Sequence, residues 1–268
     1  MIRSNRYNQP QHKKAGDVTA KKYLGQHFLT DENVAKRIAD SLGRETANVL
    51  EVGPGMGVLT KYLANDGALN FKAIEIDTES VEYLKSHYPS LTVIEGDFLR
   101  LPLNKIFDDS FSIIGNFPYN ISSQILFKVF EYRDMVPEVV GMFQKEVAER
   151  VASPSGKKSY GILSVLLTAF YDIEYLFTVQ ETVFNPPPQV KSAVIRMRRN
   201  AVEKLPCDEG LFVKVVKAGF NQRRKTLRNA LKNLDCDLSK VPDGMLEKRA
   251  EQLSCQDFIE LTLSVGGC

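Results

Sequence analysis

The sequence contains no tryptophan, only three histidines and only four cysteines in 268 residues. All four cysteines lie in the last quarter of the chain, without a CxxC pair or a nearby histidine cluster, which disfavours a zinc site and a disulfide framework. We therefore expect no metal. No apolar run reaches the roughly 18 residues of a membrane helix, and residues 1–16 lack the apolar core of a secretory signal. We expect a cytoplasmic protein that does not contact a membrane.

The net charge is also small, at +2, but it is unevenly distributed. Residues 1–24 contain six basic residues and one acid, and residues 214–232 contain seven basic residues and no acid. Two basic blocks in a nearly neutral chain are typical of a protein that binds a polyanion. Each block alone is also consistent with a solvated tail or a solvated helix face.

Short apolar runs alternate with helical patterns between residues 48 and 150. This pattern predicts strands at 48–53, 71–77, 91–96, 111–116 and 137–143, and helices at 78–87 and 121–132. Val34, Ile38 and Leu42 recur every four residues and predict another helix before the first strand. The alternation is typical of an α/β fold with a mostly parallel, doubly wound sheet.

The second half of the chain changes character. Apolar runs at 173–179 and 192–198, joined through the proline-rich stretch "NPPPQV", predict two antiparallel strands added at the sheet edge. A polar link at 200–210 follows, and the remaining residues have helical spacing. We predict three parts: a basic N-terminal tail at 1–20, a sheet domain at 21–200, and a small all-helical domain at 205–268.

The first predicted strand runs into the glycine-rich stretch "EVGPGMGVLT" at 51–60. Gly53, Gly55 and Gly57 lie at the turn from strand to helix, where glycine lets the backbone approach a ligand at a helix N-terminus. Val58 stands where the dinucleotide fingerprint has glycine, which disfavours a pyrophosphate cradle. Gly53 and Gly55 are therefore candidate contacts of another ligand.

Acidic residues follow the next two predicted strands. Glu75 ends the second strand, where a carboxylate can accept both hydroxyls of a ribose, although a solvated acid is the alternative. Asp97 follows the third strand, where it can meet an adenine amino group, and Phe98 can pack against the base. S-adenosylmethionine combines a nucleoside with a small carboxylate in place of pyrophosphate, so we predict it as the cofactor.

The stretch "GNFPYN" at 115–120 ends the fourth predicted strand, at the sheet edge where open α/β sheets bind ligands. Asn116 offers a side-chain oxygen, and Phe117 and Pro118 offer backbone carbonyls. Acceptors that hold the N–H bonds of an exocyclic adenine amine can orient its lone pair toward a methyl donor, and Tyr119 can stack on the flipped base. The alternative is a proline-stiffened turn before the next helix.

These motifs occur together in the order of a known family. The set comprises "KKYLGQHFL" (21–29), "EVGPGMGVLT", "EID", "GDF", "GNFPYNIS", "FQKEVAERV", "YGILSVL", "FNPPPQVKSAV" and "FNQRRKTLRNAL". Over residues 21–260 it resembles the ribosomal RNA adenine N6,N6-dimethyltransferase family, and most of all the bacterial branch that modifies 16S rRNA. The resemblance implies a Rossmann-like class I methyltransferase sheet with a small C-terminal all-helical domain.

The same resemblance implies a reaction and a partner. The enzyme would use S-adenosylmethionine to place two methyl groups on each of two adjacent adenosines. These adenosines would lie in a hairpin loop near the 3′ end of 16S rRNA. The enzyme would act as a monomer on the small ribosomal subunit during its biogenesis.

The resemblance also implies roles for single residues of the cofactor site. Gly53 would lie against the methionine part of the cofactor, with Glu75 at the ribose and Asp97 at the adenine end. His27 and Leu29 would contact the cofactor as well. Position 27 usually carries asparagine in the bacterial family, and an imidazole can still donate or accept a hydrogen bond there.

Other roles implied by the resemblance concern the RNA. Asn116 would lie between cofactor and target amine, Tyr119 would stack on the target base, and Phe184 would form a second aromatic wall, with core packing as the alternative for Phe184. The residues implied to contact RNA phosphates are Arg223, Arg224, Lys225 and Arg228. Their alternative role is to join the helical domain to the sheet domain.

Three other functions share parts of the pattern. The glycine spacing disfavours a nicotinamide-dependent oxidoreductase on a similar sheet. The presence of Asn116, Pro118 and Tyr119 disfavours a transcription or assembly factor without catalytic activity. The stretches "RRKTLRNAL" and "YGILSVL" disfavour the related dimethyltransferase that modifies 23S rRNA and confers antibiotic resistance.

Overall fold

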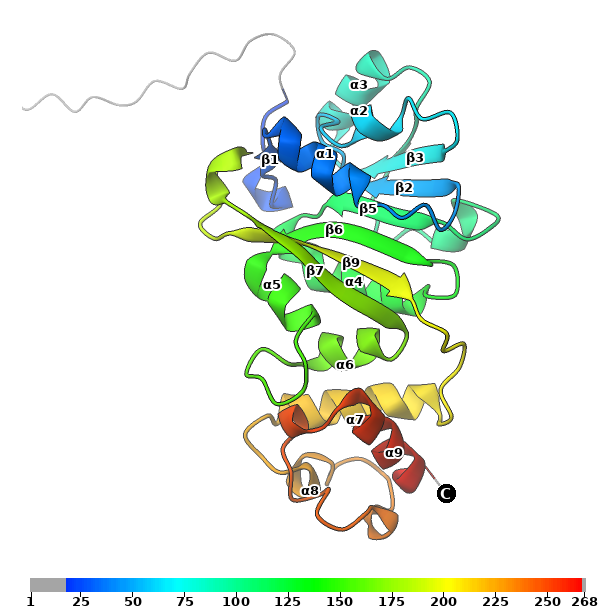
Figure 1. Ribbon diagram of the computed structural model, residues 1–268, viewed down its shortest axis with the longest axis vertical. Coiled ribbons are helices and arrows are strands. Elements are labelled where there is room, and N and C mark those ends of the chain that lie inside the picture. Colours follow the sequence, from blue (N-terminus) through cyan, green and yellow to red (C-terminus); the bar gives the residue numbers. More distant parts are fainter. Residues whose placement is uncertain (1–17, 267–268) are drawn as a thin grey trace, which may run out of the picture.

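A central sheet covered by helices on both faces organises the molecule, as the computed structural model shows (Figure 1). The structure describes residues 18–266, so nearly all of the predicted tail at 1–20 lies outside the described residues. The large sheet has seven strands in the order β4-β3-β2-β5-β6-β9-β7, and β1 (Phe28–Leu29) pairs with β8 (Phe184–Asn185) in a separate two-stranded sheet.

The large sheet is parallel over most of its width. Its strands are β2 (Asn48–Val52), β3 (Asn70–Glu75), β4 (Thr92–Glu95), β5 (Ser112–Asn116), β6 (Glu138–Gln144), β7 (Tyr171–Val179) and β9 (Ser192–Arg199). All pairs from β4 to β6 are parallel, and β9 pairs antiparallel with both β6 and β7. This confirms the predicted parallel sheet with an antiparallel edge. The strand order reverses beside β2, which creates the crevice where such sheets bind ligands.

Helices connect and cover these strands. They are α1 (Glu32–Asp40), α2 (Thr60–Leu63), α3 (Thr78–His87), α4 (Ser122–Glu131), α5 (Lys145–Val151), α6 (Ile162–Thr168), α7 (Glu209–Asn221), α8 (Leu227–Ala230) and α9 (Cys255–Val265). Helix α1 begins after Asp31, whose side chain accepts hydrogen bonds from the backbone nitrogens of Asn33 at 2.8 Å and Val34 at 3.0 Å. This N-cap fixes where the first helix starts.

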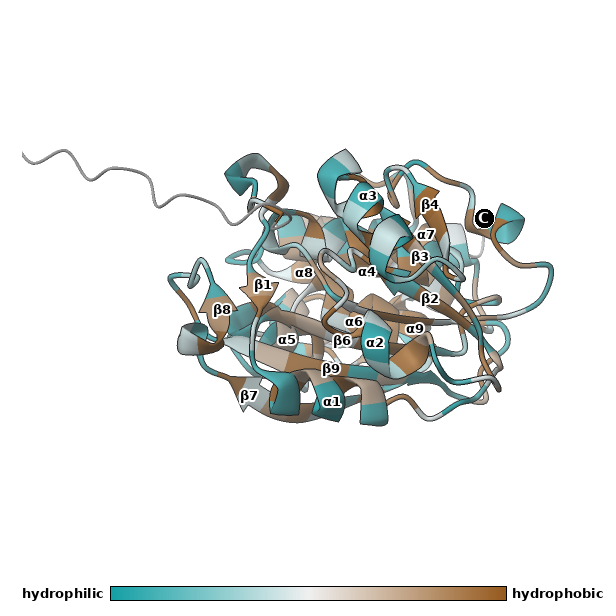
Figure 2. Ribbon diagram, turned by 90° about the horizontal axis from the view of Figure 1, so that it is seen from above, coloured by the Kyte–Doolittle hydropathy of each residue, from teal (hydrophilic) through white to brown (hydrophobic). Residues whose placement is uncertain are grey.

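Neighbouring residues of the central strands face opposite cores. Leu50 and Ile113 belong to the apolar cluster beneath α4, α5 and α6, whereas Val49 and Ile114 belong to the cluster beneath α1 and α2. The strands are therefore apolar on both faces, as buried parallel strands are. Figure 2 shows this as mostly brown strands, with hydrophilic teal on α1 and α3.

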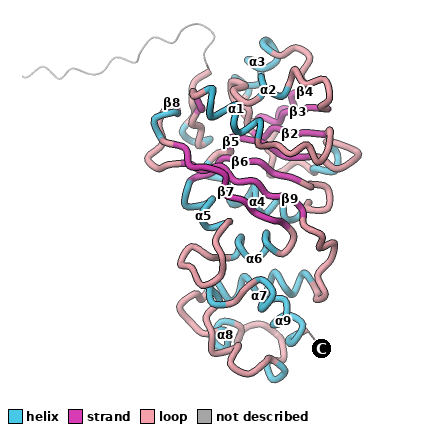
Figure 3. Tube along the Cα trace, viewed as in Figure 1, coloured by secondary structure: helices cyan, strands magenta, loops and turns pink. Residues whose placement is uncertain are grey.

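The chain after β9 contains helices and loops but no strand within the described residues (Figure 3). It is joined to the sheet part by a continuous apolar core. The rings of Tyr160 and Phe220 meet edge to face with centroids 5.9 Å apart, and Phe220 lies 5.8 Å from Phe258 on α9. None of the described helices has the length and apolar content to cross a membrane.

Candidate active site

The carboxyl ends of β2, β3, β4 and β5 meet around adjoining cavities. Gly53 borders a first cavity of about 50 Å³ that Asn116 and Tyr119 also line, a second of about 130 Å³ that Asp97 lines, and a smaller one of about 30 Å³ behind these two. Gly53 and Gly55 have φ values of +69° and +57°, which other residues rarely adopt. A Cβ atom on Gly53 would lie 3.7 Å from Cδ of Pro118. The glycine turn therefore lies close to the stretch "NFPY" at 116–119, which is called the corner below.

Glu75 forms part of the wall shared by the two larger cavities. Its side chain is almost fully buried, and Oε2 accepts a hydrogen bond from Gly55 N at 3.0 Å. Oε1 accepts bonds from the nitrogens of Ile76 and Asp77, both at 2.9 Å. Burial raises the pKa of Glu75, and the three backbone N–H groups oppose that shift. The structure thus places a fixed carboxyl group where the ribose contact was predicted.

The second cavity has the residues predicted for the adenine end. Asp97 and Phe98 line it, together with Ile76, whose side chain is 50% exposed. Oδ1 of Asp97 accepts a hydrogen bond from Leu99 N at 2.9 Å, which orients the carboxylate within its own loop. Ile76 was missed as a site residue, although an apolar residue between two acids in "EID" was a usable signal.

Lys128 on α4 supports the loop that carries Asp97. Its Nζ atom donates hydrogen bonds to the carbonyl oxygens of Leu99 at 2.9 Å and Leu101 at 2.5 Å, and it lies 5.4 Å from the centroid of Phe98. Lys128 is 7% exposed, and burial lowers its pKa. Sequence reasoning missed this lysine. Its position within the apolar run "ILFKVF" indicated a buried amine.

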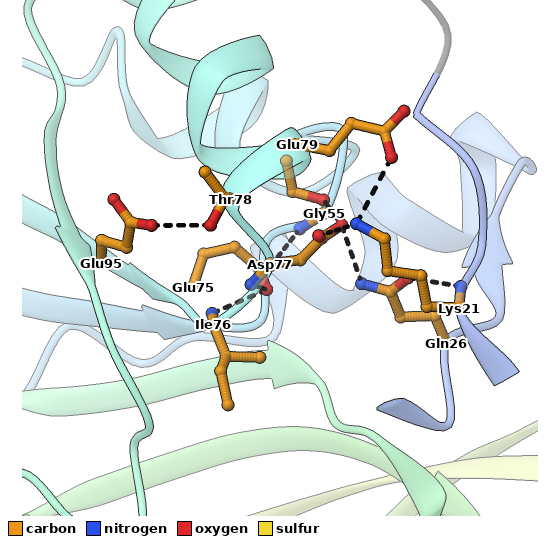
Figure 4. Close-up of polar contacts among 10 residues, drawn as sticks. Lys21, Gln26, Gly55, Glu75, Ile76, Asp77, Thr78, Glu79 and Glu95 are labelled. Carbon is orange, nitrogen blue, oxygen red and sulfur yellow. Dashed lines mark hydrogen bonds and ion pairs between the residues drawn. The ribbon is translucent and has the colours of Figure 1, made fainter. Parts of the chain in front are cut away.

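Residues 20–27, called the N-terminal segment below, are held against the same cavities through Lys21 (Figure 4). Nζ of Lys21 forms ion pairs with Asp77 and, at 3.3 Å, with Glu79. The backbone nitrogen of Lys21 donates to Oε1 of Gln26 at 2.8 Å, and Nε2 of Gln26 lies 3.5 Å from Asp77. Burial raises the pKa of Asp77, but the bonds from Lys21, Ser80 and Gln26 outweigh it and lower the pKa. This ion pair joins the N-terminal segment to the end of β3.

Asn116 is oriented by the same segment. Its Nδ2 atom donates a hydrogen bond to the backbone carbonyl of His27 at 3.0 Å, and no residue of the described chain donates to its Oδ1. Nδ1 of His27 lies 2.7 Å from the carbonyl oxygen of Pro186, and its ring stacks on Tyr119 with centroids 5.2 Å apart. The hydroxyl group of Tyr119 contacts Oγ of Ser192.

Phe117 and Pro118 differ in whether their backbone carbonyls are already hydrogen-bonded. The ring of Phe117 is buried against Phe143, with centroids 4.9 Å apart, and no hydrogen bond to its backbone carbonyl occurs within residues 18–266. The carbonyl of Pro118 already accepts a bond from Oγ of Ser122 at 3.1 Å. Phe117 therefore offers the freer of the two predicted backbone acceptors.

Two predicted site residues lie behind the cavities. Strands β1 (Phe28–Leu29) and β8 (Phe184–Asn185) pair so that Leu29 stands opposite Phe184. Both side chains are 4% exposed and belong to the apolar cluster beneath α1. Leu29 lines the small cavity behind Gly53, whereas Phe184 is absent from the walls of both larger cavities.

Arg223 lies in the turn that follows α7. Its Nε atom is 3.1 Å from a carboxylate oxygen of Glu251, and its Nη2 atom donates to the carbonyl of Lys158 at 2.5 Å. Lys158 belongs to the loop between α5 and α6. Arg223 therefore connects the helical part to the sheet part, which was the alternative role foreseen for it.

The remaining predicted RNA contacts are exposed. Arg228 pairs with Glu247 at 2.6 Å. Arg224 and Lys225 form no ion pair with any residue between 18 and 266. These two cations are therefore the most available to an anionic partner.

Comparison with known proteins identifies the family. A model of the family described as ribosomal RNA adenine dimethylase matches residues 18–256. The chain belongs to this family. It is an S-adenosylmethionine-dependent ribosomal RNA adenine dimethyltransferase with a Rossmann-like fold. The predicted enzyme class, cofactor and fold class are confirmed.

Full-length relatives and solved structures are similar to this dimethylase. The "Ribosomal RNA small subunit methyltransferase A" of Cytophaga hutchinsonii is 59% identical over 254 residues, which cover 93% of this chain and 98% of the relative. The protein of the same name from Flavobacterium johnsoniae is 58% identical over 252 residues, covering 92% and 96%. The crystal structure of a dimethyladenosine transferase from Plasmodium falciparum has a TM-score of 0.73 at 27% identity, covering 88% and 96%. The 23S rRNA methyltransferase ErmE shares the fold, with a TM-score of 0.69 at 24% identity, covering 89% of this chain and 99% of its own.

The cavity residues fit the family's cofactor. The glycine turn leaves room beside Pro118, and the fixed carboxyl group of Glu75, which already accepts three backbone hydrogen bonds, keeps an acceptor position on Oε2 for a ribose hydroxyl group. Asp97 offers an acceptor to an amino group, and the exposed side chain of Ile76 offers an apolar surface to a base. S-adenosylmethionine has a methionine part, a ribose and an adenine base in this order. The assignment of each residue to one part stays a prediction.

Proposed function

We propose that this dimethylase modifies N6 of two adjacent adenosines in a hairpin loop near the 3′ end of 16S rRNA. It acts as a monomer on the small ribosomal subunit in the cytoplasm during subunit biogenesis. Two relatives named for the small ribosomal subunit support this substrate, because they align with this chain over nearly their full lengths. The observation that carries the chemistry is the fixed amide of Asn116 beside the glycine turn.

The exocyclic amine of adenine is a poor nucleophile because its lone pair is delocalised into the ring. Bound S-adenosylmethionine supplies an electrophilic methyl group. Oδ1 of Asn116 and the backbone carbonyl of Phe117 accept hydrogen bonds from the two N–H groups of the amine. These bonds turn the lone pair of the amine nitrogen out of conjugation with the ring. The His27 carbonyl fixes Asn116 before the base arrives, so this acceptor needs little reorganisation during the reaction. A strong general base is not required, since the proton can leave after methyl transfer.

The target base stacks on Tyr119 in this proposal. His27 already covers one face of that ring, so the base takes the other face. Stacking of this kind contributes about 1 to 3 kcal/mol per base, which offsets much of the cost of flipping the nucleotide. Phe184 remains the proposed second wall. That role requires its buried side chain to rotate out of the apolar cluster beneath α1.

The RNA approaches across two domains. We assign residues 21–200 to the methyltransferase domain and residues 205–268 to a helical RNA-binding domain. Arg224 and Lys225 bind phosphate groups, because they are exposed and unpaired within the described chain. Arg223 and Arg228 belong to the same basic run but form ion pairs with Glu251 and Glu247.

A labelling experiment tests the proposed substrate. Small subunits that lack the modification are incubated with labelled S-adenosylmethionine, and the labelled nucleoside is identified after digestion of the RNA. We expect N6,N6-dimethyladenosine in 16S rRNA with the wild-type enzyme and none with Asn116→Ala. Asn104→Ala, at an exposed asparagine outside the site, should retain full activity. Label in protein-free 23S rRNA but not in small subunits would contradict the proposal.

A further inference from the structure

A groove of about 800 Å³ runs beside the catalytic corner. The N-terminal segment forms one wall, and the proline-rich loop between β8 and β9 forms the other. The groove shares Gly25, Gln26, His27 and Tyr119 with the first cavity. It is therefore continuous with the place where the target amine must lie, and a strand that delivers a base to the cavity would pass along it.

The lining of the groove suits single-stranded nucleic acid. Among residues 18–266 no carboxylate lines it, and Lys22 supplies a positive charge at its edge. Pro186, Pro187 and Val190 are exposed and offer apolar surface to the face of a base. Flat apolar contacts with nearby hydrogen-bonding groups are the usual means of holding unpaired nucleotides.

Two side-chain amides in this groove are free to read a base. Gln144 ends β6, and Gln189 lies in the loop before β9; neither side chain forms a hydrogen bond with another residue of the described chain. The amide of Gln26 is already engaged by Lys21 and Asp77. A free glutamine amide presents a donor and an acceptor side by side, which matches N7 and the N6 amino group of adenine.

Gln144 is also close to the catalytic corner. Its backbone stands opposite Ser192 in the sheet, and Oγ of Ser192 contacts the hydroxyl group of Tyr119. A base held by Gln144 would therefore adjoin a base stacked on Tyr119. Adjacent nucleotides in one strand have this relationship.

We propose that the groove holds the second adenosine of the substrate pair while the first occupies the cavity, and that Gln144 and Gln189 recognise the second base by its edge. This inference rests on the proposed function, because it requires two neighbouring adenosines. The groove then selects a target adenosine by the identity of its neighbour. Because dimethylation leaves N6 without an N–H group to donate, this contact acts while the first adenosine of the pair is being methylated.

Small subunits with one adenosine of the pair replaced by guanosine test this proposal. Guanine has an acceptor, O6, where adenine has its amino group, so a bidentate contact with an amide is lost. We expect kcat/KM at the remaining adenosine to fall about tenfold for the wild-type enzyme, in line with the loss of one such contact. In the Gln144→Met, Gln189→Met double variant, the ratio of kcat/KM between the two substrates should approach unity.

Two further variants separate recognition from misfolding. Gln189→Met alone changes an exposed loop residue and should lower the ratio part of the way. Gln256→Met, at an exposed glutamine on α9, should keep the wild-type ratio. Affinity for S-adenosylmethionine, measured by calorimetry, should be unchanged in all of these variants.

The outcomes distinguish this proposal from the proposed function. If the wild-type enzyme methylates both substrates equally, or if the double variant keeps the wild-type ratio, the groove does not read the neighbouring base. The proposed function would stand in either case, because 16S rRNA would still be methylated. Absence of methyl transfer to any small subunit would overturn the proposed function and the role of the groove with it.

Discussion

Nδ2 of Asn116 lies 3.0 Å from the backbone carbonyl oxygen of His27 and donates a hydrogen bond to it. A carbonyl oxygen can only accept, so this contact fixes which way the amide of Asn116 is turned. Oδ1 is thereby left as the free acceptor. The contact depends on the backbone at position 27, and the side chain there has separate partners in Pro186 and Tyr119.

The first prediction concerns the separate contacts of the backbone and the side chain at position 27. His27→Asn should leave the dissociation constant for S-adenosylmethionine within a few fold of the wild-type value, because the backbone carbonyl is retained. Calorimetry measures this directly, and a collapse of binding would show that the imidazole itself holds the cofactor.

Asn116→Asp is the contrasting variant. Its carboxylate cannot donate to the His27 carbonyl, and leaving this partly buried acceptor unpaired costs about 1 to 3 kcal/mol. The side chain at 116 then loses its fixed orientation, so kcat should fall roughly 10- to 100-fold.

The second prediction concerns Glu51 on β2. Its side chain is 1% exposed, and Oγ1 of Thr60 donates a hydrogen bond to Oε2 at 2.6 Å. Burial raises the pKa of Glu51 to about 8, against the opposing bond from Thr60. In the folded protein Glu51 is therefore protonated at neutral pH. In the unfolded chain it is ionised.

Because the folded pKa lies above the unfolded one, the contribution of Glu51 to stability is fully present in acid and is lost as pH rises through about 8. The loss amounts to roughly 1.4 kcal/mol per pH unit between the two pKa values. Glu51→Gln should remove this dependence, so its free energy of unfolding relative to wild type should increase with pH. Urea unfolding at several pH values tests this. Glu82→Gln, at an exposed position, is the control, and a pH-independent difference for Glu51→Gln would refute the prediction.

Much of the fold was predictable because the central strands are continuous apolar runs. Helix α3 occupies the predicted residues 78–87, since the helical spacing of its residues is a local feature. The pairing of β1 with β8 could not be predicted. Each strand has only two residues, and the partners are far apart in sequence, so neither periodicity nor a turn signal identifies them.

The predicted site residues lie together where strands end. Glu75 and Asn116 are the last residues of β3 and β5, Asp97 follows the end of β4, and parallel strands bring their carboxyl ends to one edge. Lys21 and Lys128 were missed for a different reason. Lys21 was counted only as part of the basic block at residues 1–24. The apolar run around Lys128 indicated a buried amine, but its partners are backbone carbonyls, which the sequence does not identify.

The third prediction concerns Lys128. Lys128→Met keeps most of the buried stem but removes the hydrogen bonds to Leu99 and Leu101. Hydrogen bonds to a charged group contribute about 1.5 to 3 kcal/mol, so the loop that carries Asp97 should lose part of its order. Affinity for S-adenosylmethionine should fall about tenfold if half of that energy serves to position the loop. Lys85→Met, at an exposed lysine on α3, should not change it. Equal affinity in the Lys128 variant would mean that the loop is held by other contacts.

The fourth prediction separates phosphate contacts from structural ion pairs in the basic run after α7. Arg224 and Lys225 are exposed and form no ion pair within residues 18–266, whereas Arg223 is tied to Glu251. Each phosphate contact contributes about 0.7 to 0.9 to the slope of log K against log salt concentration. Replacing Arg224 and Lys225 by alanine should therefore flatten the slope for small-subunit binding by roughly 1.4 to 1.8. The paired replacement of the exposed Lys85 and Lys105 by alanine should leave the slope unchanged. An unchanged slope in the Arg224, Lys225 variant would assign the basic run to packing between the two parts of the chain, since counterion release requires direct contact with phosphate.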